Sequence, residues 1–197
     1  MRILAIDPGP VKSGYVFYAP DEAKPIVGFY WMQNESLLFE LSKLPTHIGW
    51  NKCHVIIEAA SDFMGRLYNR DMALTSFWWG RFTQRAIDNG VHESVGSMTA
   101  RDVRRNLCGS AGIKEKTTKQ GVIDYFGGNT RAIGGVRCPK CKGKGWFGPG
   151  RNTCPQCSGS KWEQPPGVLY EVKRNGNQHV WSALALAVTY ADQNKEA

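Results

Sequence analysis

Two carboxylates stand at the ends of apolar, strand-like runs in the first third of the chain. Asp7 closes the run ILAID, and Glu58 closes the run VIIE. Adjacent strands would hold the two carboxylates side by side, where their mutual repulsion favours a cation between them. Hard oxygen ligands of this kind suit Mg²⁺ or Mn²⁺, and a pair of such ions can activate water for phosphodiester hydrolysis.

The residues behind Asp7 also favour an open site. Pro8 and Gly9 stop the strand, so that no side chain crowds the carboxylate and a phosphate backbone can approach it. For Asp7 taken alone, a helix N-cap or a salt-bridged carboxylate is an equally good explanation.

Four of the six cysteines form two C-x-x-C pairs separated by twelve residues: Cys138 with Cys141, and Cys154 with Cys157. This spacing predicts a structural tetrathiolate Zn²⁺ site. A pair of disulfides is the alternative, and disulfides are rare in a cytosolic chain. The pairs and their glycines resemble the zinc modules of DnaJ-type chaperones. Cys53 and Cys108 stand alone and are predicted to be buried apolar residues.

The net charge of +8 is concentrated in one stretch of the chain. Residues 101–174 contain fifteen Lys and Arg against five Asp and Glu, whereas the rest contains ten against twelve. A surface that binds a polyanion would show such a surplus, although on the charge alone a solvated polar surface is the preferred explanation.

Length and composition bound the class of protein. The chain has 197 residues, of which 42% are hydrophobic and 21% charged, as in a globular protein with one core and a small annex. No apolar run approaches the roughly 20 residues of a membrane helix. The first residues do not form a signal peptide, so we expect a cytoplasmic protein without a membrane partner.

The order of predicted elements is that of an α/β protein. Strands are predicted over 2–7, 13–19, 25–32, 53–59 and 91–96, and helices over 34–44, 68–89, 99–107, 114–126 and 179–192. Asn34 or Ser36 would cap the first helix. This order predicts a mixed sheet flanked by helices, formed by 1–129 and 164–197, with a small zinc-binding insertion over 130–163.

The segment ILAIDPGPVKSGYVFY resembles the opening of RuvC-type Holliday junction resolvases, which belong to the RNase H-like nuclease superfamily. In that family the first strand carries a catalytic Asp and a central strand ends on a Glu, which match Asp7 and Glu58. The segment NQHVWSALALA resembles the helix that carries the last two ligands, which fall on His179 and Ser182. The resemblance implies an RNase H-like fold in which Asp7, Glu58 and His179 hold Mg²⁺ or Mn²⁺.

Ser182 departs from the family pattern, which has an acidic residue at this catalytic position. Three residues separate it from His179, so both side chains should lie on one helix face. A hydroxyl carries no charge and is a weak Mg²⁺ ligand. The site would then bind its second ion weakly, recruit another acid such as Asp62, or be impaired as a nuclease.

The segment from Thr99 to Gly127 resembles the family stretch in which spaced lysines precede a helix, which implies contacts to the DNA backbone. In the insertion, basic residues alternate with Trp146 and Phe147, which would either stack on bases or pack the core of the module. The predicted DNA-binding residues are Arg101, Arg104, Arg105, Lys114, Lys116, Lys119, Lys140, Lys142, Lys144 and Arg151.

The resemblance implies a homodimeric endonuclease that resolves four-way (Holliday) junctions in double-stranded DNA by divalent-metal-dependent hydrolysis, leaving a 5′-phosphate and a 3′-hydroxyl. The helix over 68–89, with Trp78 and Trp79, would lie in the core or at the dimer interface. Two alternatives keep the fold: a non-catalytic protein that binds branched DNA, and a nuclease directed to flaps or RNA. A protein-binding role of the zinc module rests on the DnaJ resemblance alone.

Overall fold

The computed structural model describes residues 1–43, 52–59, 69–90, 93–110, 112, 115–147 and 151–195, without the side chains of 115–117 and 147. The chain forms two compact units. The first comprises Met1–Val122 and Asn175–Ala197, and the second comprises Ile123–Arg174. The predicted boundaries of the insertion, 130–163, stay a prediction. Asp62, Lys114 and the side chain of Lys116 lie outside the described residues.

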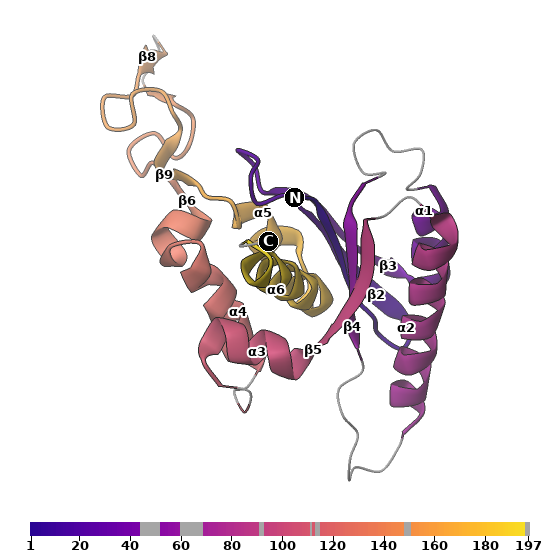
Figure 1. Cartoon of the computed structure of the whole chain (residues 1–197). Coiled ribbons are helices and arrows are strands. Elements are labelled where there is room, and N and C mark those ends of the chain that lie inside the picture. Colours follow the sequence, from indigo (N-terminus) through magenta and orange to yellow (C-terminus); the bar gives the residue numbers. More distant parts are fainter. Residues whose placement is uncertain are drawn as a thin grey trace. The chain divides into compact units, whose positions relative to one another are not determined.

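The first unit is built on a five-stranded mixed sheet with the order β3-β2-β1-β4-β5 (Figure 1). β2 pairs antiparallel with both β1 and β3, whereas β1, β4 and β5 run parallel. The strands are β1 (Ile3–Asp7), β2 (Lys12–Tyr18), β3 (Ile26–Gln33), β4 (His54–Ala59) and β5 (Ser94–Thr99). All five residues of β1 are buried, as expected for a central strand that is covered on both faces.

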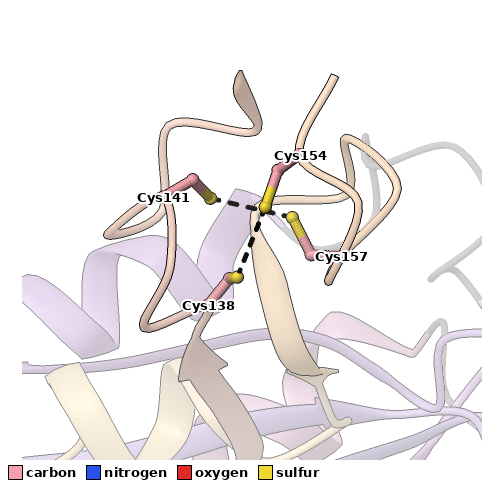
Figure 2. Close-up of side chains that lie close together, drawn as sticks. All are labelled: Cys138, Cys141, Cys154 and Cys157. Atoms are coloured by element: carbon pink, nitrogen blue, oxygen red, sulfur yellow. Dashed lines mark hydrogen bonds between the residues drawn. The ribbon is translucent and has the colours of Figure 1, made fainter. Parts of the chain in front are cut away.

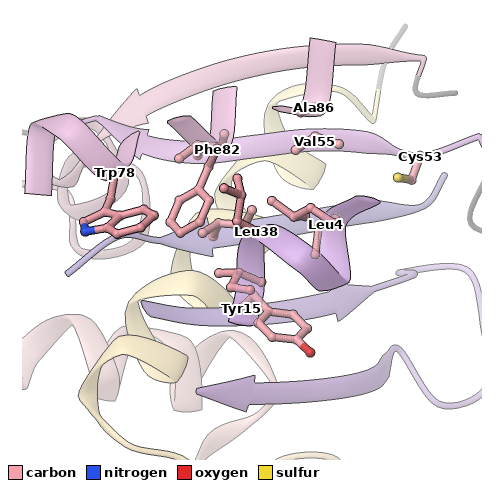
Figure 3. Packing of buried hydrophobic residues seen from close by; sticks show 12 residues of the cluster. Leu4, Tyr15, Leu38, Cys53, Val55, Trp78, Phe82 and Ala86 are labelled. Carbon is pink, nitrogen blue, oxygen red and sulfur yellow. The ribbon is translucent and has the colours of Figure 1, made fainter. Parts of the chain in front are cut away.

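Helices cover both faces of this sheet (Figure 1). On one face lie α1 (Asn34–Lys43) and α2 (Arg70–Asn89), and on the other lies α6 (Gln178–Gln193). Alternate residues of β1 and β4 reach the first face, where Leu4 and Val55 pack with Leu38, Trp78 and Phe82 (Figure 3). Trp78 is therefore a core residue.

The sequence determines where several helices begin and end. Asn69 caps α2 by accepting a hydrogen bond from the amide of Met72, and Gly90 ends it in the left-handed conformation. Thr99 and Asp102 form a capping box at the start of α3 (Ala100–Cys108). α4 (Glu115–Tyr125) follows. Within the described residues, no helix has the length and apolarity that would allow it to span a bilayer.

The structure differs from the sequence predictions of local structure at three points. The strand predicted at 91–96 is β5, which runs from Ser94 to Thr99 because it takes its register from β4 rather than from an apolar run of its own. The helix α5 (Tyr170–Asn175) was not predicted, since six residues are too few for a clear period. Cys108 is half-buried, whereas Cys53 is buried as predicted.

The second unit consists of two small antiparallel sheets with a π-helix and α5. One sheet pairs β6 (Gly134–Arg137) with β9 (Trp162–Pro166), and the other pairs β7 (Trp146–Phe147) with β8 (Asn152–Thr153). The π-helix η2 comprises Asn129–Ile133. Gly134 has a positive φ of 52°, and a Cβ atom there would lie 2.1 Å from the carbonyl oxygen of Pro165. Only glycine allows β6 to approach β9 so closely at this point.

Candidate active site and zinc centre

The carboxylates of Asp7 and Glu58 project from neighbouring strands at the same level. In the parallel pairing of β1 with β4, Ile6 lies beside Ile57, so the next step of this register brings Asp7 beside Glu58. His54, four residues before Glu58 on the same strand face, hydrogen-bonds to Tyr190 of α6. The two carboxylates therefore project toward the α6 face of the sheet.

His179 of α6 completes this cluster. Its Nδ1 atom lies 2.8 Å from Oδ2 of Asp7, at the level where β1 ends. Asn177 caps α6 by accepting a hydrogen bond from the amide of Val180 at 3.0 Å, which fixes the first helical turn and with it His179. The Asp7 side chain is largely buried, and the His179 side chain remains one-third exposed.

Two glycines make room for His179. A Cβ atom on Gly14 of β2 would lie 2.4 Å from the carbonyl carbon of His179 and 2.6 Å from the amide nitrogen of Val180. A Cβ atom on Gly9 would lie 2.9 Å from Cε1 of the His179 ring. Gly9 thus leaves space for the imidazole, and the predicted open approach of a phosphate backbone to Asp7 stays a prediction.

A buried hydrogen-bond network holds the turn after Asp7. The hydroxyl of Ser13 donates to Oδ1 of Asn34 at 2.6 Å, and Nδ2 of Asn34 donates to the carbonyl oxygen of Gly9 at 3.0 Å. The amide of Gly9 in turn donates to Ser13 Oγ at 3.3 Å. The Asn34 side chain therefore supports this turn, and the cap of α1 by Asn34 or Ser36 stays a prediction. The sequence prediction did not assign Asn34 to the site.

The structure unites Asp7 with His179 but does not gather all the predicted ligands around one point. Among the described residues, the four cysteines are the group whose ligand atoms all lie within 4.8 Å of one another. In the present side-chain arrangement, this condition is not fulfilled by the ligand atoms of Asp7, Glu58 and His179. Ser182 lines a pocket of about 320 Å³ together with Lys119 and Trp181.

The four cysteine sulfurs have the spacing of a tetrahedral zinc site. Figure 2 shows their side chains turned toward one another. Sγ of Cys138 lies 3.8 Å from Sγ of Cys154, and Sγ of Cys141 lies 3.7 Å from Sγ of Cys157. A tetrahedron with zinc–sulfur bonds of about 2.3 Å has edges of about 3.8 Å. Disulfide bonds need about 2.05 Å, so this geometry fits zinc and the alternative of two disulfides is wrong.

Backbone amides, burial and neighbouring thiols shift the pKa values of the cysteines in this centre. Burial raises the pKa of Cys141, but the amide of Gly145, which donates to its sulfur at 3.3 Å, and the neighbouring thiols lower it to about 6. The amide of Cys141 and, less strongly, that of Lys140 lower the pKa of Cys138, but burial and the sulfurs of Cys141 and Cys154 outweigh them and raise this pKa to about 11. A bound zinc ion would favour the thiolate at every position of the set.

The two knuckles that carry the cysteines are internal copies of each other. CPKCKGKGW (138–146) and CPQCSGSKW (154–162) share Cys, Pro, Gly and Trp at equivalent positions. The residue after each second cysteine is left-handed, with φ of 50° at Lys142 and 46° at Ser158. The amide of Cys154 donates to the Gly145 carbonyl at 3.0 Å, and that of Cys138 donates to Lys161 at 3.1 Å. The two knuckles thus pair with each other through equivalent, reciprocal hydrogen bonds.

The predicted DNA-binding residues fall on both units. On α3, Arg105 forms an exposed ion pair with Asp102, and Arg104 donates to the carbonyl oxygen of Ala100. Lys119 of α4 places its Nζ atom 4.5 Å from the centre of the Trp181 ring. The remaining described members are exposed: Arg101, Lys140, Lys142, Lys144 and Arg151.

Comparison with known proteins supports the fold. No protein-family model matches the chain, and no curated protein matches it. A structure of RuvC from Thermus thermophilus is similar to it, with 15% sequence identity, a TM-score of 0.58, and coverage of 100% of this chain and 96% of that chain. The chain has a RuvC-like fold. A second structure, T. thermophilus RuvC in complex with a Holliday junction substrate, aligns with the same coverage, 14% identity and a TM-score of 0.57.

The predicted fold class, an RNase H-like mixed sheet flanked by helices, is confirmed by this similarity and by the strand order. The cysteine cluster fits the predicted small zinc-binding insertion. The roles of Asp7, Glu58, His179 and Ser182 stay predictions.

Proposed function

We propose that the protein is a structure-selective endonuclease that cleaves four-way DNA junctions by divalent-metal-dependent phosphodiester hydrolysis. The observation that carries this proposal is the contact of Asp7 with His179, beside the strand position of Glu58. The RuvC-like fold supports it, since one similar RuvC structure was determined with a Holliday junction substrate.

Asp7, Glu58 and His179 would hold Mg²⁺ or Mn²⁺, with Ser182 at the fourth position. Carboxylate oxygens and an imidazole nitrogen are donors that these ions accept. In this side-chain arrangement the ligand atoms of the three residues do not all lie within 4.8 Å of one another. Two ions that share Asp7 would allow Glu58 and His179 to bind different ions. Such a pair supplies an activated water and stabilises the leaving oxygen.

The protein would bind the arms of the junction through its basic surfaces. Arg101 and Arg105 are exposed on α3 and Lys119 is exposed on α4, so the first unit would offer several cations to phosphates. The lysines of the zinc module would add further backbone contacts. Binding of this kind weakens steeply as the salt concentration rises.

Two symmetric cuts in one junction require two active sites, and a homodimer would supply them. The helix α2 would form the interface. Its residues Phe77 and Ile87 are each more than half exposed, although Trp78 is buried in the core. Sedimentation of the purified protein with and without junction DNA tests this part of the proposal.

Ser182 supports a second candidate, a protein that binds branched DNA without cutting it. The position carries no charge and lines a pocket with Lys119. Cleavage of an end-labelled four-way junction in Mg²⁺ or Mn²⁺, mapped at nucleotide resolution, separates the candidates. Paired cuts at symmetric positions support a resolvase. Tight binding without cuts supports the second candidate, and preferred cleavage of a flap or an RNA–DNA hybrid would assign another substrate.

A further inference from the structure

The two copies of the zinc knuckle differ in charge at four positions. At one of them the second copy carries Lys161 where the first carries Gly145, and at the other three the lysine belongs to the first copy. The first copy carries a lysine at each position where the second carries a neutral polar residue: Lys140, Lys142 and Lys144 against Gln156, Ser158 and Ser160. Both copies adopt the same left-handed turns and the same hydrogen bonds. Because the second copy forms the same turns without a lysine at these three positions, neither the backbone nor the cysteine cluster requires Lys140, Lys142 or Lys144.

The tryptophans that end the two copies also have different surroundings. Trp162 is half-buried, and its ring centre lies 5.9 Å from that of Tyr170 in an edge-to-face contact. Trp146 is 36% exposed, and two cations lie over its ring: Lys144 Nζ at 5.4 Å and the Arg151 guanidinium carbon at 5.5 Å from the ring centre. The ring of Trp146 is therefore the more accessible of the two, whereas Trp162 packs against Tyr170.

We propose that Trp146, with Lys144 and Arg151, is a stacking site for unpaired nucleotides. The inference rests on the proposed function in taking nucleic acid as the ligand, but it requires no cleavage. An aromatic face stacks on any base, whereas the faces of paired bases are covered by their neighbours in the helix. The ligand class is thus single-stranded or unpaired segments, bound without sequence preference.

The balance of contacts favours the base over the cations that cover the ring. A cation over an exposed ring contributes a factor of about 2 to 5 to an equilibrium constant. Stacking of one base contributes about 5- to 100-fold. A base would therefore displace a cation from the Trp146 ring, and the released Lys144 or Arg151 would be available to a neighbouring phosphate.

The test uses the full-length, zinc-loaded protein and a fluorescein-labelled thymidine oligonucleotide, followed by polarisation. Trp146→Ala should weaken binding about 5- to 100-fold, and Trp146→Phe should weaken it less, with unchanged zinc content in both. An oligonucleotide with one 2-aminopurine should lose fluorescence on the parent protein and retain it on Trp146→Ala. The loss of fluorescence reports stacking of the base on the Trp146 ring. Unchanged zinc content in Trp146→Ala shows that the module is still folded, so unfolding does not explain the difference.

A charge exchange provides the matched control. Lys140→Gln, Lys142→Ser and Lys144→Ser together give the first copy the residues of the second, and adding Gln156→Lys, Ser158→Lys and Ser160→Lys restores the net charge on the other copy. We expect the first set to weaken binding and the second set not to restore it. Restored binding would overturn the inference, because any basic surface would then suffice. Equal competition by polyglutamate would likewise overturn it in favour of an acidic protein ligand.

The same preparations are assayed for junction cleavage, which keeps the two proposals separate. If cleavage is absent but oligonucleotide binding depends on Trp146, the inference holds and the proposed nuclease activity fails. If junctions are cut and Trp146→Ala binds the oligonucleotide normally, the stacking site alone is refuted.

Discussion

The Nδ1 atom of His179 lies 2.8 Å from the Oδ2 atom of Asp7, although 172 positions separate the two residues in the chain. The contact joins the end of the first strand to the first turn of the last helix. It depends on close packing, since Gly14 leaves no space for a side chain against the backbone of His179. The geometry of the candidate site is therefore linked to the docking of α6 on the sheet.

Asp7→Asn should abolish cleavage while leaving junction affinity near that of the parent protein. The substitution keeps the size of the side chain but removes a charge that the divalent ions would need. We expect the cleavage rate to fall by about 100-fold or more, measured with saturating junction and Mg²⁺. Asp21→Asn, an exposed carboxylate after β2 that pairs with the N-terminal amine, is the matched control. An unchanged rate in Asp7→Asn would remove this residue from the site.

Gly14→Ala should destabilise the first unit and disturb the active site together. The new methyl group would meet the backbone of His179 at 2.4 Å, where no side chain can rotate away. We expect a loss of about 1–3 kcal/mol or more in the free energy of unfolding by urea, with a parallel loss of cleavage. Gly28→Ala on β3 is the control, because its nearest neighbour would be 3.6 Å away. Equal stability of the two variants would contradict the close packing.

The sequence predicts those features in which a chemically distinctive residue, such as a carboxylate or a cysteine, lies in a regular pattern of apolar residues or at a regular spacing. Three such features are confirmed: the strand that ends at Asp7, the strand that contains Glu58 one residue before its end, and the two cysteine pairs. The role of Asn34 could not be predicted, because its residue type is equally suited to a helix cap, and only the fold brings it to Gly9. The limits of β5 depend on its pairing with β4, which a short, half-exposed edge strand does not reveal in its own residues.

Asn34→Ala should destabilise the turn after Asp7. It leaves the Gly9 carbonyl and the Ser13 hydroxyl buried with one partner fewer, a loss of about 1–3 kcal/mol in the free energy of unfolding. A double-mutant cycle with Ser13→Ala measures the coupling, which we expect to be about 0.5–3 kcal/mol. Strictly additive effects would show that the two side chains do not act as one network.

Replacing Cys138 and Cys141 with Ser should release zinc and weaken junction binding more than it affects the fold of the first unit. The four sulfurs belong to a compact unit of their own, so the five-stranded sheet does not depend on the metal. Zinc release is measured with a chromogenic chelator, and the sheet is monitored by thermal unfolding. Cys108→Ser, outside the cluster, is the control and should retain zinc. Zinc loss without any change in DNA affinity would make the module purely structural.

Ser182→Asp tests whether the departure from the family pattern limits the candidate site. The position is one helical turn from His179, so a carboxylate there would add a negative ligand beside the two charges of Asp7 and Glu58. We expect cleavage to rise most at low Mg²⁺, where occupancy of the ion site limits the rate, and less in excess Mn²⁺, which tolerates poorer ligand sets. The measurement is the cleavage rate against Mg²⁺ concentration.

The surroundings of Ser182 offer a competing outcome for the same variant. Lys119 lines the pocket that contains Ser182, so the new carboxylate could pair with its ammonium group instead of an ion. Ser182→Asn is the matched control, because it adds similar bulk without charge, and Ser182→Asp combined with Lys119→Gln removes the competing cation. If His179 and water already complete the site, the added carboxylate would overcrowd it. A lower rate at every Mg²⁺ concentration, in the single and the double variant alike, would show that a hydroxyl is suited to this site and that no ligand is missing.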